Sequence, residues 1–254
     1  MPAGPILYLV LLLSAALGFS LGAFGGGGTL LAVPMLMYVA GMDAKNAIGT
    51  SLLIVGLTSL VAAGMYWRAG RVELRAVLML GLSGALGAVL GAQVTSWVSD
   101  FVLTVLFATL MLLVSLRMLF SRDSKRTEKH AQARRRPMVL LSVGTAIGFL
   151  TGFLGVGGGF LLVPALAILV NLPMKQAVGT SLAIVTLNST LGFFGHMAEL
   201  SVNLWSAASL ALPAAVGALV GQRLAHRWSE QRIRTGFAVL SMLVAIGMLA
   251  KELS

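Results

Sequence analysis

Long apolar runs alternate with short polar connections along almost the whole chain. They divide into ten segments, five in each half of the sequence. The segments of the first half are 6–24, 29–40, 47–67, 74–95 and 101–120, and those of the second half are 139–154, 160–170, 177–195, 204–222 and 233–250. A helix needs about 20 apolar residues to cross a bilayer, and the third, fourth and fifth segments of each half meet or approach that length. The pattern therefore predicts an all-α integral membrane protein.

The second segment of each half is too short to cross a membrane alone, because a helix of its length covers only about 17 Å. In the first half it follows the glycine run Gly25–Gly28. Each glycine in a helix interior costs roughly 1 kcal/mol relative to alanine, so we expect the helix to break at this run. The first two segments of each half are predicted to form a glycine-broken hairpin of helices, and three spanning helices follow it.

The two halves are copies of one unit. When residues 18–61 are aligned with 148–191, without a gap, 20 of 44 positions are identical. The second copy of the glycine run is Gly155–Gly159, and the same offset of 130 residues fits the rest of the chain. We therefore divide the chain into a first membrane repeat at 1–120, a basic linker at 121–137 and a second membrane repeat at 138–254. A duplicated membrane unit with a broken helix in each copy is typical of secondary transporters whose binding site lies between the repeats.

Composition and charge support this class and orient the repeats. Hydrophobic residues make up 58% of the chain and charged residues only 10%, whereas soluble proteins carry roughly 25%. The net charge of +10 lies in the connections, as expected of cytoplasmic loops, so we expect no nucleic-acid partner. If each hairpin returns to the side it entered, 16 of the 18 Lys and Arg residues are cytoplasmic, and if it crosses, only 12 are. The charge bias favours inverted repeats, with the linker cytoplasmic and both termini outside.

The glycine breaks are the predicted substrate-binding site. Non-helical backbone at membrane depth is tolerated where protein buries it or where it lines a polar cavity, and helix N-termini bind anions. Hydroxyl groups of the two GTS triplets could donate to the same anion, although bonds to the helix backbone or to another helix would use them equally well. The candidate substrate-binding residues are Gly25, Gly26, Gly27, Gly28, Thr29, Thr50, Ser51, Gly155, Gly157, Gly158, Gly159, Thr180 and Ser181. Asn188 is a weaker candidate.

Other glycines are spaced for helix packing. Four small-xxx-small pairs lie in the apolar segments: Gly18 with Gly22, Gly87 with Gly91, Gly148 with Gly152, and Gly217 with Gly221. This spacing lets two helices approach closely, so we assign these eight glycines to packing.

Several kinds of chemistry have no residues to support them. The chain has no cysteine, and all eight carboxylates fall in or near connections, so a mid-membrane proton relay has no obvious carrier. A nucleophile elbow, an HExxH pair and a phosphate-binding loop with its lysine are all missing from the sequence. We therefore expect no enzymatic activity, no cofactor and no metal site.

The motif GAFGGGGTLLAVP before AIGTSL, repeated as GFLGVGGGFLLVP before AVGTSL, resembles the TauE/SafE sulfite exporter family over essentially the whole chain. The resemblance implies a multi-pass permease of the bacterial cytoplasmic membrane for sulfur-containing anions such as sulfite or an organosulfonate. Combined with the repeats, it suggests alternating access around a central site. An anion channel, a permease for an unrelated substrate such as a carboxylate or metal cation, and a non-transporting membrane scaffold are the alternatives. The copies differ where Gly159 replaces Thr29, so the two half-sites need not be equivalent.

Overall fold

The computed structural model describes residues 5–95, 100–120, 137–153, 159–196 and 204–252, and every regular element in these ranges is helical. The elements of the first half are α1 (Pro5–Phe24), the short 3₁₀ helix η1 (Gly26–Gly28), α2 (Thr29–Tyr38), α3 (Ala44–Arg68), α4 (Leu74–Thr95) and α5 (Asp100–Phe120). Those of the second half are α7 (Pro137–Phe153), α8 (Gly159–Ile168), α9 (Met174–His196), α10 (Leu204–Arg227) and α11 (Glu230–Glu252). The predicted linker at 121–137 lies outside the described residues except for its last residue, Pro137, which begins α7.

The predicted all-α membrane architecture is confirmed. Among the described residues, six helices are long and apolar enough to span a bilayer, namely α3, α4, α5, α9, α10 and α11. These are the third, fourth and fifth predicted segments of each half, and their ends differ from the predicted ones by a few residues because polar side chains join the first and last turns. Asp43, for example, starts α3 by accepting a bond from the Asn46 amide nitrogen at 3.2 Å.

The second helix of each half is short, as predicted. α2 and α8 have 10 residues each and cover about 15 Å. α1 ends at Phe24, and Gly25 follows with φ +80°, a conformation that glycine adopts without strain. The chain then turns back through η1, so that Gly28 lies against Leu17 and Leu21 of α1.

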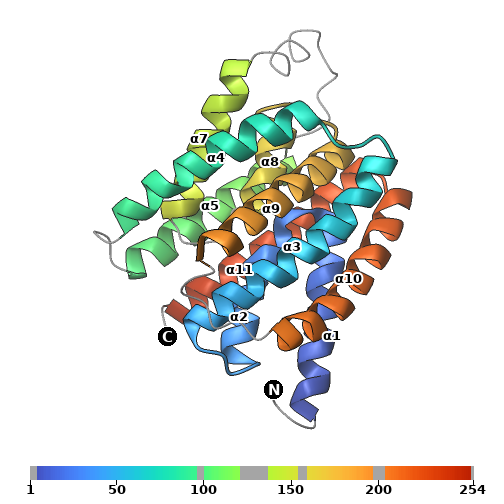
Figure 1. Ribbon diagram of the computed structural model, residues 1–254. Helices are drawn as coiled ribbons and strands as arrows, with labels where there is room; N and C mark the ends of the chain where they lie inside the picture. The colour runs from blue at the N-terminus through green and yellow to red at the C-terminus, as the bar shows by residue number, and fades with distance from the viewer. Residues whose placement is uncertain (1–4, 96–99, 121–136, 154–158, 197–203, 253–254) are drawn as a thin grey trace.

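Each half contributes one helix to each of two outer pairs. α4 packs along α7, and α1 packs along α10, and these are the most extensive helix contacts among the described residues. The α4–α7 pair and the α1–α10 pair lie on opposite sides of α3 and α9, which pack on each other between them (Figure 1). The two pairs are counterparts, because the offset of 130 residues turns α1 into α7 and α4 into α10.

Glycines form the contacts within both outer pairs. Gly18 and Gly22 of α1 face the backbone of Ala214 and Ala218 of α10. In the other pair, Gly148 and Gly152 of α7 face Gly84 and Ala88 of α4. The packing role predicted for the spaced glycines is confirmed, since Gly87, Gly91, Gly217 and Gly221 also meet the backbone of the partner helix.

The same contacts give the helix directions. Residue numbers rise together along the α1–α10 pair and along the α4–α7 pair, so the helices of each pair run parallel. Along α3 and α9 they change in opposite senses, since Gly56 faces Ser189 and Gly179 faces Tyr66, so these two helices are antiparallel. α5 packs on α11 and contacts the core through Phe107, whose ring meets Phe160 of α8 edge to face at 5.0 Å.

Candidate functional site: two helix breaks beside a cavity

The first glycine break meets the N-terminal end of α8, which follows the second glycine run. Gly26 lies directly against the backbone of Gly159 and Phe160, where α8 begins. Gly159 in turn lies against the side chain of Thr29, the first residue of α2. The N-terminal ends of α2 and α8 are therefore neighbours, although 130 residues separate them in the sequence.

Atoms of α8 and α9 fill the space around Gly25, so a larger side chain is excluded there. A methyl group on Gly25 would fall 2.7 Å from the hydroxyl oxygen of Ser181 and from a methyl carbon of Val163. The Gly25 amide donates to the Leu21 carbonyl at 2.8 Å and so closes the end of α1. Glycine is required here for both its positive φ and its size.

Three of the predicted hydroxyl groups bond to backbone carbonyls three residues away, and the Thr180 hydroxyl bonds to a distant part of the chain. Thr29 Oγ1 donates to the Gly26 carbonyl at 2.6 Å, Ser51 Oγ to the Ile48 carbonyl at 2.8 Å, and Ser181 Oγ to the Val178 carbonyl at 2.8 Å. Thr180 Oγ1 accepts from the Glu73 amide at 3.0 Å and ties the start of α9 to the start of α4. In this conformation Ser51 and Ser181 thus follow the alternative expectation, bonding back to the helix backbone.

A cavity of about 630 Å³ lies beside the meeting point of the breaks. Thr29, Ser51 and Gly159 are the predicted site residues that line it. Its other walls come from α4 and α7, with Gly84 and Gly148, and from α9. None of the described residues that line it is charged. A ligand of this cavity would be held by backbone amides, hydroxyls and side-chain amides.

The other predicted residues divide into three groups. Gly25, Gly26, Gly28 and Ser181 are buried at the meeting point, outside the cavity lining. Thr50 is buried in α3, Thr180 bonds to the Glu73 amide just before α4, and Gly27 lies within η1. Gly155, Gly157 and Gly158 lie outside the described residues.

Three polar residues of the cavity are predicted only weakly from the sequence or are not predicted at all. Asn188 and Ser189 of α9 and Thr151 of α7 line the cavity. The Asn188 Oδ1 atom is buried and has no hydrogen-bond partner among the described residues. Asn188 is a weak candidate from the repeat alignment, whereas Ser189 and Thr151 resemble the other small polar residues of apolar helices. Only the fold identifies these two.

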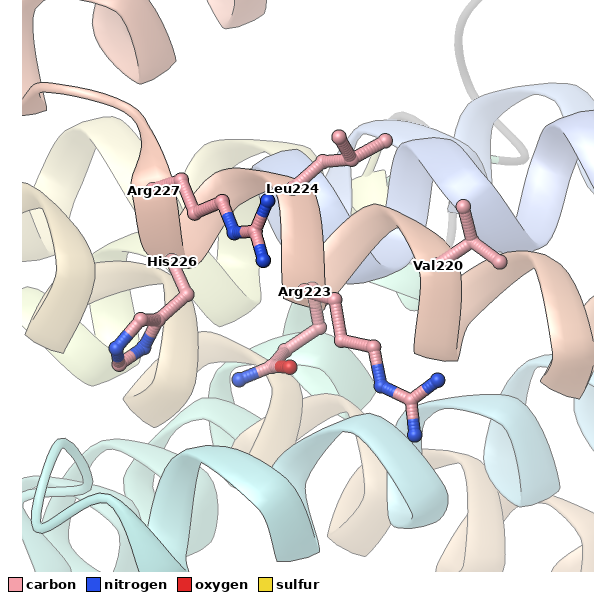
Figure 2. A pocket seen from close by; sticks show the side chains of 6 residues that line it. Val220, Arg223, Leu224, His226 and Arg227 are labelled. Carbon is pink, nitrogen blue, oxygen red and sulfur yellow. The ribbon is translucent and has the colours of Figure 1, made fainter.

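A second cavity, of about 500 Å³, lies at the end of α10. Figure 2 shows Arg223, His226 and Arg227 extending from the last turns of this helix beside it. The Lys175 ammonium donates to the His226 carbonyl at 2.9 Å, so α9 starts beside the end of α10. The basic residues are exposed and belong to a connection between helices, as expected of a membrane surface.

Among the residues that the structure describes, no group of three or more His, Asp or Glu side chains is placed to hold a metal ion.

The fold and the central breaks define a class, that of multi-pass helical membrane transporters, and known proteins of this class match almost the whole chain. A probable membrane transporter protein of Xylella fastidiosa (strain Temecula1) is 35% identical over 239 residues, which are 90% of this chain and 89% of the relative. The probable membrane transporter protein YunE of Bacillus subtilis is 28% identical over 261 residues, 94% of each chain. The family model for the sulfite exporter TauE/SafE matches residues 10–248, and the chain belongs to this family. No solved structure gives a significant match.

Proposed function

We propose that this protein is a secondary transporter that moves a small sulfur-containing anion, such as sulfite or an organosulfonate, by alternating access around a central site. The observation that carries the proposal is the meeting of the α2 and α8 N-terminal ends beside a cavity whose described lining residues are uncharged. Unpaired amides at a helix N-terminus carry about +0.5 charge equivalent, so they attract an anion without a cationic side chain. The family supports a sulfur oxyanion, because its model is described as a sulfite exporter.

The proposed binding residues combine backbone and side chains. The amides of the glycine runs, at Gly26–Gly28 and from Gly157 to Gly159, would donate to the anion oxygens, whereas the Thr29 amide already bonds to the Gly26 carbonyl. Ser51 and Asn188 line the same cavity and would complete the contacts, with the Ser51 hydroxyl turning away from the Ile48 carbonyl when an anion is present. A cavity of about 630 Å³ is in the range of small-molecule sites and leaves room for water around sulfite or for the organic part of a sulfonate.

We infer that the halves are inverted repeats. α3 and its counterpart α9 run antiparallel, whereas parallel repeats would make counterparts run in the same direction. α1 runs parallel to α10, the counterpart of α4, and α4 runs parallel to α7, the counterpart of α1. Both relations are those expected when one half is turned over in the membrane relative to the other.

The positions of the basic connections support one orientation in a bacterial inner membrane. In this orientation the end of the molecule that carries these connections faces the cytoplasm. Gly179 of α9 lies against Tyr66 and the Arg71 carbonyl, and Lys175 bonds to the end of α10. The connections after α3 and after α10 are therefore close together, and each carries several arginines. Positive residues concentrate on the cytoplasmic side. The cavity residues of α4 and α9 lie at or beyond Leu80 and Val185, toward the opposite end, so we assign the cavity to the outward-facing side.

Radiolabelled sulfite flux into proteoliposomes that hold the purified protein tests the proposal. Excess sulfate, thiosulfate, sulfoacetate and acetate serve as competitors, and empty liposomes serve as the control. We expect saturable flux that the sulfur anions reduce selectively. Selective competition by acetate would instead indicate a carboxylate permease, unsaturable flux with single-channel currents would indicate an anion channel, and absent flux of every anion with folded protein would indicate a scaffold.

A further inference from the structure

The cavity lies on one side of the molecule, whereas the sequence that builds it is duplicated. Its walls include the α4–α7 pair together with parts of α3 and α9. Adding or subtracting 130 converts each lining residue into its counterpart in the other half. Three pairs of lining residues, Thr29 with Gly159, Ala32 with Leu162 and Val55 with Val185, are counterparts of each other and are shared. The remaining counterparts belong to the α1–α10 pair, to the central helices α3 and α9, and to α8. The repeats therefore provide two equivalent places for a cavity.

The second place is closed by packing. Of the counterparts, Leu17, Leu21, Ala214 and Leu182 are at most 4% exposed. α10 also packs along α3 more extensively than its counterpart α4 packs along α9. The α1–α10 pair thus packs closely against the central helices α3 and α9, whereas the α4–α7 pair packs against them less extensively. This asymmetry leaves the cavity beside the α4–α7 pair.

Both outer pairs are suited to move as units. Within each pair the helices run parallel with backbone against backbone, through Gly18 on Ala214 in one and Gly148 on Gly84 in the other. Helices joined by such close contacts slide apart with difficulty, because every glycine contact along them would have to break together. Between α4 and the central helix α9, in contrast, Gly81 meets the side chains of Leu187 and Ile184. The extent of the contact between an outer pair and the central helices also differs between the two sides.

The closed place contains hydroxyl groups that have no partner. Ser14 of α1 and Thr58 and Ser59 of α3 are fully buried, and their oxygens make no hydrogen bond within the described residues. A buried polar group without a partner costs about 1–3 kcal/mol. The counterparts of Thr58 and Ser59 are Asn188 and Ser189, which line the open cavity. These polar groups would therefore contact water if the α1–α10 pair moved away from the central helices, to a position equivalent to that of the α4–α7 pair.

We propose that the protein has a second conformation in which the α1–α10 pair lifts from α3 and opens a cavity lined by Ser14, Thr58 and Ser59 toward the end of the molecule that carries the basic connections. In the same step the α4–α7 pair packs against α9, so that the observed cavity closes as the second cavity opens. The central breaks border both cavities. This inference rests on the proposed transport function, and it adds the identity of the second pathway and of the helices that move.

Cysteine labelling tests this directly, because the natural chain has no cysteine. The variants Ser59→Cys and Thr58→Cys probe the second cavity, and Ser189→Cys probes the open one. Ser241→Cys is the matched control, since Ser241 is also buried and unpaired but lies on α11, outside both sets of lining residues. Each variant is treated with a charged, membrane-impermeant maleimide in right-side-out and in inside-out vesicles.

We expect Ser189→Cys to react from one face and Ser59→Cys from the other. A minor conformation is commonly populated at about 0.1–10%, so Ser59→Cys should react about 10- to 1000-fold more slowly than Ser189→Cys, yet faster than Ser241→Cys. Labelling of both Ser59→Cys and Thr58→Cys no faster than the control during transport, or from the same face as Ser189→Cys, would overturn the inference. Thr58→Cys keeps the test decisive if Ser59→Cys does not fold.

Labelling and flux separate the two proposals. The accessibility of these positions does not depend on which anion is carried. Opposite-face labelling without flux of any sulfur anion would overturn the substrate assignment and leave the second cavity standing. Selective sulfite flux with inaccessible Ser59→Cys and Thr58→Cys would support the substrate and reject the second cavity.

Discussion

The substitution Gly26→Ala tests whether the close approach of the two breaks serves anion binding. A methyl group on Gly26 would overlap the Gly159 carbonyl and lie 2.5 Å from the Phe160 nitrogen, whereas ordinary contact begins at 3.4 Å. The obstacle is backbone, so no side-chain rotation relieves it, and the two helix ends must separate by about 1.5 Å. Overpacking of this kind typically costs about 1–3 kcal/mol.

In the free protein the breaks relieve this strain by moving apart, and an anion that needs both helix ends must bring them together again. At 1.4 kcal/mol for each factor of ten, we expect sulfite to bind about 5- to 140-fold more weakly. Isothermal titration of the purified variant and the sulfite concentration that gives half-maximal flux in proteoliposomes both measure this change.

Two companion variants make the comparison quantitative. In Gly159→Ala the new methyl group meets the ends of the Thr29 and Val185 side chains, at 2.8 and 2.9 Å, so a smaller loss of affinity, below about tenfold, is expected. Gly64→Ala is the control, because no heavy atom lies within 4 Å of the added carbon. It should bind sulfite normally and gain up to about 1 kcal/mol from helix propensity. Wild-type affinity and flux in Gly26→Ala would refute the reasoning, because the breaks would then not act together.

Three further outcomes are expected. Tyr66→Phe removes the buried hydrogen bond from the Tyr66 hydroxyl to the Gly22 carbonyl, which is 3.2 Å long. It should lower the free energy of unfolding in detergent by about 0.5–1.5 kcal/mol, with little effect on flux. An unchanged unfolding midpoint would contradict this role. Asn188→Leu removes the amide from the cavity and should raise the half-saturating sulfite concentration roughly tenfold, as for loss of a hydrogen bond to a charged group, whereas an unaltered value would remove Asn188 from the site. A reporter fused after Ser254 should be active outside the cytoplasm, and cytoplasmic activity would favour parallel halves.

The helices follow from the sequence because uninterrupted apolar runs and glycine breaks are strong local signals. The spaced glycines also predict close helix contacts, but they do not predict the partner. Gly18 and Gly22 form a flat surface that would fit any other surface of small residues equally well, and only the fold shows that the partner is α10 in the other half. The same limit applies to the contribution of α4 and α7 to the cavity.

Part of the candidate site is predictable for a related reason. The breaks had to lie where backbone is sheltered, and the structure brings Thr29 and Gly159 together there. The direction of a hydroxyl bond depends instead on rotation about one side-chain torsion, and nothing in the GTS triplets distinguishes a bond to an anion from the observed bond of Ser51 to Ile48. The repeated sequence also does not predict which outer pair packs closely against the central helices. Each half contributes one helix to the closely packed pair and one helix to the pair beside the cavity.

The pairing of α1 with α10 has a consequence for how the protein is made. Gly18 meets Ala214, which the ribosome adds 196 residues later. At about 5–20 residues per second, α1 waits roughly 10–40 s in the membrane before its partner exists. During that time its glycine surface faces lipid or a temporary protein neighbour, so a chain that stops before α10 should insert but remain unpaired and sensitive to membrane proteases. One of the contacts that hold the finished halves together is thus among the last that the nascent chain can form.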